Sequence, residues 1–143
     1  MQNFFTNTIT VNTDKTTILE ILLDPKQLMH WDSEIQVVYP QDKSNGYQIL
    51  RAGDAANKTE TLTISRNQDS VDYYIHGDRL SYLVKFDLIS DSDTTTIKQH
   101  VSIDTDTWLA SPIMWFKPIA KRAFLENLQV LAAIAEHWSN KSN

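Results

Sequence analysis

Cysteine is absent from this chain of 143 residues. Its absence excludes disulfide bonds, thiolate nucleophiles, zinc–thiolate sites and iron–sulfur clusters. Glycine is also scarce, with three residues in all, and neither a phosphate-cradling glycine loop nor a G-x-S-x-G motif occurs. The sequence therefore argues against nucleotide binding and against nucleophilic catalysis of the common kinds.

A basic surface is lacking as well, since 13 Lys and Arg face 18 Asp and Glu and the formal net charge is −5. That balance argues against a nucleic-acid partner. No apolar run approaches the roughly 18 residues of a membrane span, and the first residues resemble no signal peptide. We therefore expect a soluble, cytoplasmic protein with no integral membrane segment.

The content of 41% hydrophobic and 10% aromatic residues is that of a folded globular protein. The length suits one domain with one core, spanning residues 1–143. Neither an internal repeat nor a linker interrupts the chain.

The only long segment with a helical period is 111–139. Its apolar stripe comprises Phe116, Ala120, Ala123, Phe124, Leu131, Ile134, Ala135 and Trp138. Ser111 and Pro112 form a start signal, with Ser as N-cap and Pro at the first helical position. Pro118 predicts either a kink or a short first turn followed by the main helix.

The segments before this helix read mostly as strands. A first alternating segment spans about residues 3–12, with Asn7 on its apolar side. A short helix follows, and Asp24-Pro25 starts a second one that ends near Trp31. From Glu34 onward, period-2 alternation and short turns predict six further antiparallel strands.

This order predicts an α+β fold of the helix-grip type. A curved seven-stranded antiparallel sheet would wrap around the C-terminal helix, with two short helices after the first strand. The alternative is a cone-shaped fold like that of the nuclear transport factors, which usually places its long helices first.

The order of elements resembles the START-like or SRPBCC superfamily, which includes polyketide cyclases and lipid-transfer domains. The most similar local pattern is 21–32, an apolar helix followed by Asp24-Pro25 and a short helix ending in Trp31. The terminal helix beginning near Ser111-Pro112 is the second point of likeness. The resemblance covers essentially the whole chain but indicates no subfamily. It implies a deep, mostly apolar cavity between the sheet and the terminal helix.

Polar side chains on the buried faces are the candidates for lining such a cavity, because a binding site needs a few placed polar groups in an apolar wall. Tyr39 is among these polar residues, but the tyrosines could also lie at sheet ends with their hydroxyls in water. Asn127 projects from the apolar stripe, so it either bonds a strand carbonyl or lines the cavity. We predict ligand contacts from Trp31, Tyr47, Arg51, Tyr73, Tyr82, Phe86, Gln99, Trp108, Phe124 and Asn127.

The segment Trp108–Phe116 is very apolar for a connection into a helix. It could form a lip of the cavity, a contact with a homodimer or other partner, or a plug at the end of the core. The four histidines lack the close spacing of metal ligands, so we expect neither a metal nor a cofactor. Asp32, Glu34 and Glu60 could face a cavity, but a solvated surface position is the default for such carboxylates.

Three functions remain open at this point. The first is binding or carriage of a small hydrophobic molecule, lipid-like or polyketide-like. The second is a cyclase or dehydratase on the same scaffold, in which a tyrosine or Arg51 polarises a carbonyl. A carboxylate, tyrosine or histidine deep in the cavity beside a second polar group would favour this enzyme. The third is a protein-interaction module like the co-chaperone relatives of the fold, which predicts a filled core and an exposed apolar patch.

Overall fold

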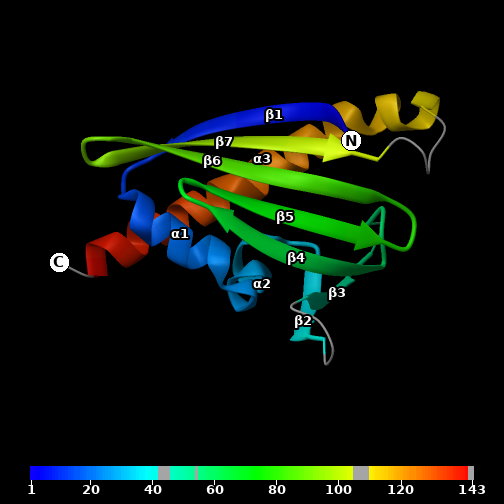
Figure 1. Cartoon of the computed structure of the whole chain (residues 1–143), viewed down its shortest axis with the longest axis horizontal. Coiled ribbons are helices and arrows are strands. Elements are labelled where there is room, and N and C mark those ends of the chain that lie inside the picture. Colours follow the sequence, from blue (N-terminus) through cyan, green and yellow to red (C-terminus); the bar gives the residue numbers. More distant parts are fainter. Residues whose placement is uncertain (42–45, 54, 105–109, 142–143) are drawn as a thin grey trace.

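The computed structural model describes residues 1–41, 46–53, 55–104 and 110–141, without the side chains of 110–114. One sheet and a long terminal helix dominate the chain (Figure 1). Within the described residues, no helix is long and apolar enough to cross a membrane.

The sheet has seven antiparallel strands in the order β1-β7-β6-β5-β4-β3-β2. The strands are β1 (Gln2–Val11), β2 (Ile35–Pro40), β3 (Tyr47–Arg51), β4 (Thr59–Asn67), β5 (Ser70–Gly77), β6 (Ser81–Asp91) and β7 (Thr94–Ile103). From β2 to β7 each strand pairs with the next one in sequence, and β1 joins at the far edge beside β7. This is the pairing that the short connections predict.

Two short helical segments separate β1 from β2. Helix α1 (Lys15–Leu23) is capped by Asp14, whose carboxylate accepts a hydrogen bond from the backbone N–H of Thr17. Asp24 then caps a 3₁₀ turn, η1 (Pro25–Gln27), which leads into α2 (Leu28–Trp31). The Asp-Pro start signal is confirmed, although the expected single helix is divided between η1 and α2.

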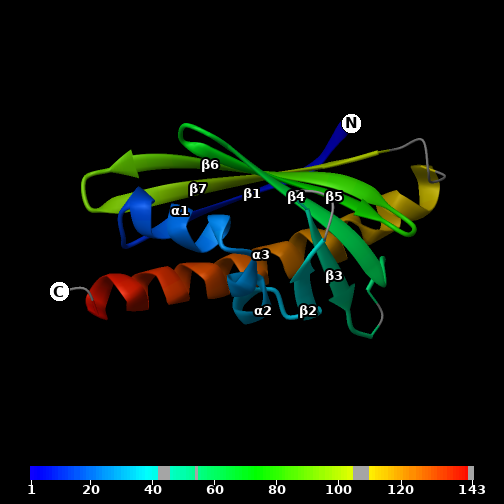
Figure 2. The same ribbon diagram turned by 60° about the horizontal axis from the view of Figure 1, so that its bottom comes forward.

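Helix α3 (Ala110–Lys141) crosses the sheet, on the same side as α1 and α2 (Figure 2). Leu128, Leu131 and Ala135 on α3 are fully buried. Each buried leucine stabilises the fold by about 1.5–3 kcal/mol relative to an exposed position. The predicted helix-grip fold, with its long C-terminal helix held against a curved antiparallel sheet, is confirmed.

The beginning of α3 differs from the sequence-based expectation. Ala110 is already helical, so Ser111 lies inside the helix rather than at its N-cap. The helix also continues through Pro118 without a break, which excludes the separate first turn. A proline removes one backbone hydrogen bond, and the remaining bonds of a long helix packed on a sheet can tolerate that loss.

Candidate functional site

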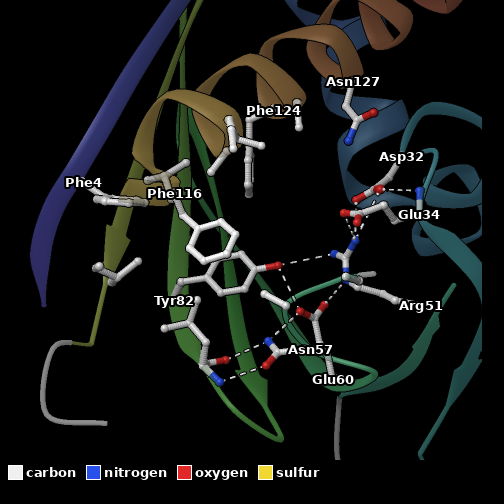
Figure 3. A pocket seen from close by; sticks show the side chains of 18 of the residues that line it. Phe4, Asp32, Glu34, Arg51, Asn57, Glu60, Tyr82, Phe116, Phe124 and Asn127 are labelled. Carbon is white, nitrogen blue, oxygen red and sulfur yellow. Dashed lines mark hydrogen bonds and ion pairs between the residues drawn. The ribbon is translucent and has the colours of Figure 1, made fainter. Parts of the chain in front are cut away.

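A cavity of about 350 Å³ lies between the first half of α3 and the sheet. We call it the outer cavity. Its wall is mostly apolar, and Figure 3 shows Phe116 and Phe124 of α3 near Tyr82 of β6. The apolar lining residues are Phe4, Phe5, Ala55, Ala56, Leu80, Val101, Ile103, Phe116, Ile119, Ala120, Ala123 and Phe124.

One part of this cavity is charged and is organised by Arg51, the last residue of β3. The Arg51 side chain is 9% exposed and meets three carboxylates. Its Nε donates to Glu60 Oε1 at 2.7 Å, and one terminal nitrogen lies 3.2 Å from Asp32 Oδ2. The same nitrogen lies 3.6 Å from Glu34 Oε1. Arg51 therefore ties β3 and β4 to the segment that follows α2.

Tyr82 completes this cluster from β6, three strands away from Arg51 in the sheet. Its hydroxyl donates to Glu60 Oε2 at 3.1 Å and accepts from the other terminal nitrogen of Arg51 at 3.3 Å (Figure 3). Tyr82 and Glu60 are both buried, with 8% and 2% exposure. The hydrogen bonds hold the tyrosine ring in a fixed place in the cavity wall.

Asn57 supports Glu60 from the connection before β4. Its Nδ2 donates to Glu60 Oε2 at 2.9 Å and to the carbonyl of Leu80 at 2.8 Å. Its Oδ1 accepts from the backbone N–H groups of Arg79 and Leu80. A side chain at Gly77 would overlap the Asn57 amide, so the glycine is needed here to make room for it.

Three carboxylates and one guanidinium leave the cluster with a formal charge of −2. Burial disfavours the charge of Arg51, but Tyr82, Asp32 and Glu60 outweigh it and raise the pKa of the guanidinium above its usual value. Burial is also the main reason that the pKa of the Tyr82 phenol is raised. Arg51 therefore stays cationic and Tyr82 stays a protonated donor.

Glu34 is the most accessible carboxylate of the cluster, with a side chain that is 48% exposed. Its pKa is raised, chiefly by burial, with a further contribution from the charges of Asp32 and Glu60 that opposes the lowering effect of Arg51. A carboxyl group that holds its proton more tightly than usual at the wall of a cavity can take part in proton transfer.

A second space, the inner cavity, has a volume of about 30 Å³. It shares Asp32, Arg51, Tyr82, Phe124 and Asn127 with the wall of the outer cavity. Its other lining residues are Leu28, Trp31, Ile35, Ile49, Leu62, Tyr73, Ile75, Val84, Phe86 and Gln99. The shared wall places the two cavities next to each other.

The structure brings eight of the ten predicted contact residues to these cavities. Four of them line both cavities, namely Arg51, Tyr82, Phe124 and Asn127. Four line the inner cavity alone, namely Trp31, Tyr73, Phe86 and Gln99. Tyr47 lines neither cavity, and Trp108 lies outside the described residues.

Tyr39 and Tyr73 differ in burial, although the alternation of their strands places both on a buried face. Tyr39 was expected on a buried face but is 46% exposed, because β2 is an edge strand. Tyr73 is buried, and its hydroxyl donates to the carbonyl of Leu22 in α1 rather than to water. Among the described residues, the side chain of Asn127 makes one hydrogen bond, in which its Oδ1 accepts from the backbone N–H of Ser33 at 3.4 Å, and no bond to a strand carbonyl.

The charged residues of the cavity wall are buried more deeply than the sequence alone predicts. A cavity position and a solvated surface position were both open for Glu60, with the surface as the default, and the default is wrong because the Glu60 side chain is 1% exposed. Glu60 is two residues before Leu62 and four before Ile64 on β4, and this period-2 spacing is the signal that places it on their face of the sheet. Asn57 lies outside any strand, so no periodic signal indicates its role.

Apolar side chains are exposed at the first described turns of α3. Trp115, Phe116 and Ile119 are 81%, 55% and 68% exposed. Phe116 and Ile119 also line the outer cavity, so part of this surface forms its lip. The predicted contact of Trp108–Phe116 with a second copy or another partner stays a prediction, since Trp108, Leu109 and the side chains of 110–114 lie outside what the structure describes.

His76 on β5 and His100 on β7 lie on strands that are separated by β6, and each has other hydrogen-bond partners. His76 pairs with Ser81, and His100 contacts Thr6 and Asp87. Throughout the described ranges, no group of three or more His, Cys, Asp or Glu side chains is arranged to hold a metal ion.

No protein-family model matches the sequence, and no curated protein matches it. Solved structures match its fold. A conserved protein from Geobacillus kaustophilus is similar with a TM-score of 0.71 and 12% identity, over 91% of this chain and 93% of that one. A START superfamily protein from Mycobacterium smegmatis is similar with a TM-score of 0.67 and 16% identity, over 97% of this chain and 98% of that one.

The di-domain ARO/CYC protein StfQ from the steffimycin biosynthetic pathway is also similar, with a TM-score of 0.71 and 10% identity. The match covers 95% of this chain and 51% of StfQ. At these identities the likeness shows the fold, which is the START-like helix-grip fold. It carries no residue roles from those proteins to this one.

Proposed function

We propose that this protein binds or carries a small, largely hydrophobic molecule in the outer cavity. The observation that supports it is a cavity of about 350 Å³ with an apolar wall and one cluster of fixed polar groups. That size and that combination are typical of small-molecule sites. The START superfamily neighbour and the polyketide-pathway neighbour have the same fold, which is compatible with a lipid-like or polyketide-like ligand.

Filling the outer cavity tests this function. Ala120 lies in its wall, and Ala120→Phe places a ring in the space that a ligand would occupy. We expect the neutral fluorescent probe N-phenylnaphthylamine to bind the native protein saturably and the variant at least about tenfold more weakly, because a filled site cannot accept it. Fluorescence titration measures both affinities.

Ala133→Phe is the matched control, since Ala133 is exposed on the same helix and lines neither cavity. It should bind the probe like the native protein. Equal affinities for all three proteins, or no binding by the native protein, would contradict the proposed site. Native mass spectrometry of protein purified from cells would identify the natural ligand from the mass of its adduct.

A second candidate function is a cyclase-type or dehydratase-type enzyme. Tyr82 and Glu60 form the buried pair of polar groups that this alternative requires, and Glu34 adds a carboxyl group with a raised pKa. In a dehydration, Glu34 would remove the proton next to a ketone and then pass it to the β-hydroxyl group, which leaves as water while the carbon–carbon double bond forms. The position of Glu34 on the cavity wall supports this role.

The enzyme is tested with an aromatic β-hydroxy ketone as substrate and the conjugated enone as the product measured by absorbance. Glu34→Gln should lower the rate by at least about 100-fold, the usual contribution of a general base. Glu20→Gln, on an exposed site of α1, should leave the rate unchanged. A native rate equal to the buffer rate would exclude this activity for that substrate class.

A further inference from the structure

The inner cavity contains hydrogen-bond donors that have no acceptor. The indole nitrogen of Trp31 is buried without a hydrogen-bond partner, and Trp31 as a whole is 5% exposed. A buried donor without an acceptor usually costs about 1–3 kcal/mol. Trp31 lines the inner cavity, so an acceptor that enters this space can remove that cost.

Gln99 supplies a second donor, and its orientation is fixed by a neighbour. Asn7 Nδ2 donates both to the carbonyl of Lys121 and to Gln99 Oε1, each at 3.1 Å. The Gln99 oxygen must therefore face Asn7, which leaves its Nε2 group as the free end. Among the described residues this nitrogen has no hydrogen-bond partner, and Gln99 is 1% exposed.

Asn127 supplies a third donor at the wall that the two cavities share. Its oxygen is used by the backbone N–H of Ser33, so its amide nitrogen is the free end. Figure 3 shows the Asn127 side chain directed from α3 toward the cluster around Asp32. Three elements thus contribute N–H groups to the wall of the inner cavity.

Two acceptors in the wall of the inner cavity are already engaged. Asp32 accepts hydrogen bonds from Arg51, and the Tyr82 hydroxyl accepts one from Arg51 while it donates to Glu60. The surplus in the wall is therefore one of donors. A space of about 30 Å³ admits one oxygen atom with a small substituent but no ring, since a single water needs roughly 10–15 Å³.

We propose that the ligand of the outer cavity carries a carbonyl or similar acceptor oxygen, which enters the inner cavity and accepts hydrogen bonds from Trp31, Gln99 and Asn127. This inference rests on the proposed binding function and adds the polar group of the ligand to it. The apolar body of the ligand stays between α3 and the sheet. Arg51 is not the anchor, because its guanidinium is already bonded to Asp32, Glu60 and Tyr82.

Two probes of the same shape test whether an acceptor oxygen adds to the affinity beyond simple hydrophobic binding. Methyl naphthyl ketone and isopropenylnaphthalene differ in having either an oxygen or a CH₂ group at one position. We expect the ketone to bind about tenfold more tightly, the effect of one or two buried hydrogen bonds. Isothermal titration calorimetry measures both affinities.

Trp31→Phe removes the indole donor and keeps an aromatic ring, and Asn127→Leu removes the amide with little change in volume. Each variant should lose most of the preference for the ketone and bind the alkene as the native protein does. Trp138→Phe is the control, since Trp138 lines neither cavity. In the native protein, the indole N–H resonance of Trp31 should shift with the ketone and not with the alkene.

The outcomes are distinguishable. Equal affinities of the native protein for the two probes would overturn the acceptor proposal while leaving the binding function intact, and would assign the inner cavity to water. Binding of neither probe would overturn the binding function and this inference together. A ketone preference that survives in both variants would also overturn it, because the donors would lie elsewhere.

Discussion

Arg51→Met is expected to lower the free energy of unfolding by about 3–5 kcal/mol, the usual cost of removing one partner of a buried ion pair. The guanidinium is 9% exposed and the Glu60 carboxylate is 1% exposed, so the loss of Arg51 leaves a negative charge inside the protein. Asp32, with a side chain that is 12% exposed, loses its partner as well. Urea denaturation at neutral pH measures the change.

The double variant Arg51→Met with Glu60→Gln separates the stranded charge from lost packing. A glutamine oxygen can still accept from Tyr82 and Asn57, but it carries no charge. The double variant should therefore be more stable than Arg51→Met alone. Arg66→Met, at an exposed position on β4, should change stability by less than about 0.5 kcal/mol. Equal losses in the single and double variants would contradict the assigned role of the ion pair.

The same cluster shows which part of the site the sequence could predict. Period-2 alternation places Arg51 on the face of β3 that carries Tyr47 and Ile49, and it places Tyr82 on the inner face of β6. A strand pattern contains this information because successive side chains point to opposite faces. The sheet face on which a side chain lies can therefore be predicted from the residues next to it in the sequence.

The partners of Arg51 could not be predicted in this way. Glu60 reaches it from β4, Tyr82 from β6 and Asp32 from the loop after α2, and no local pattern records these encounters. A charged residue on an inner face is ambiguous until its counter-ion is known, because unpaired buried charges are rare. For this reason a surface position was the default expectation for Glu60, with a position facing the cavity left open.

Buried polar residues show the same difference between what the sequence predicts, which is the face of a residue, and what it does not predict, which is its partners. Asn7 on β1 was predicted to share the apolar face, and the structure confirms that it is buried. Its bonds to Gln99 and to the carbonyl of Lys121 join β1, β7 and α3, which lie far apart in sequence. Tertiary pairing, rather than any pattern along the chain, thus leaves Gln99 with a free donor.

We predict that one narrow face of α3 provides most of the stability that the packing of this helix against the sheet contributes. Leu131 is fully buried in the core, and Leu131→Ala should lower the free energy of unfolding by about 3 kcal/mol, since it removes buried methyl groups and leaves a cavity. Val130 is the next residue back and is 43% exposed, so Val130→Ala should change stability by less than about 0.5 kcal/mol. Denaturant unfolding of both variants measures the difference.

Leu131 lines neither cavity, so a folded Leu131→Ala protein should bind N-phenylnaphthylamine with native affinity. Ala120→Phe should show the opposite combination, with weak binding and a folded chain, because the outer cavity already provides space for the added ring. This separation is expected because α3 packs into the core through Leu128 and Leu131, which line neither cavity, while Ala120 lies in the wall of the outer cavity. If Leu131→Ala and Val130→Ala were equally destabilising, the assigned rotation of α3 about its axis would be wrong, and the cavity built on its first half would lose its basis.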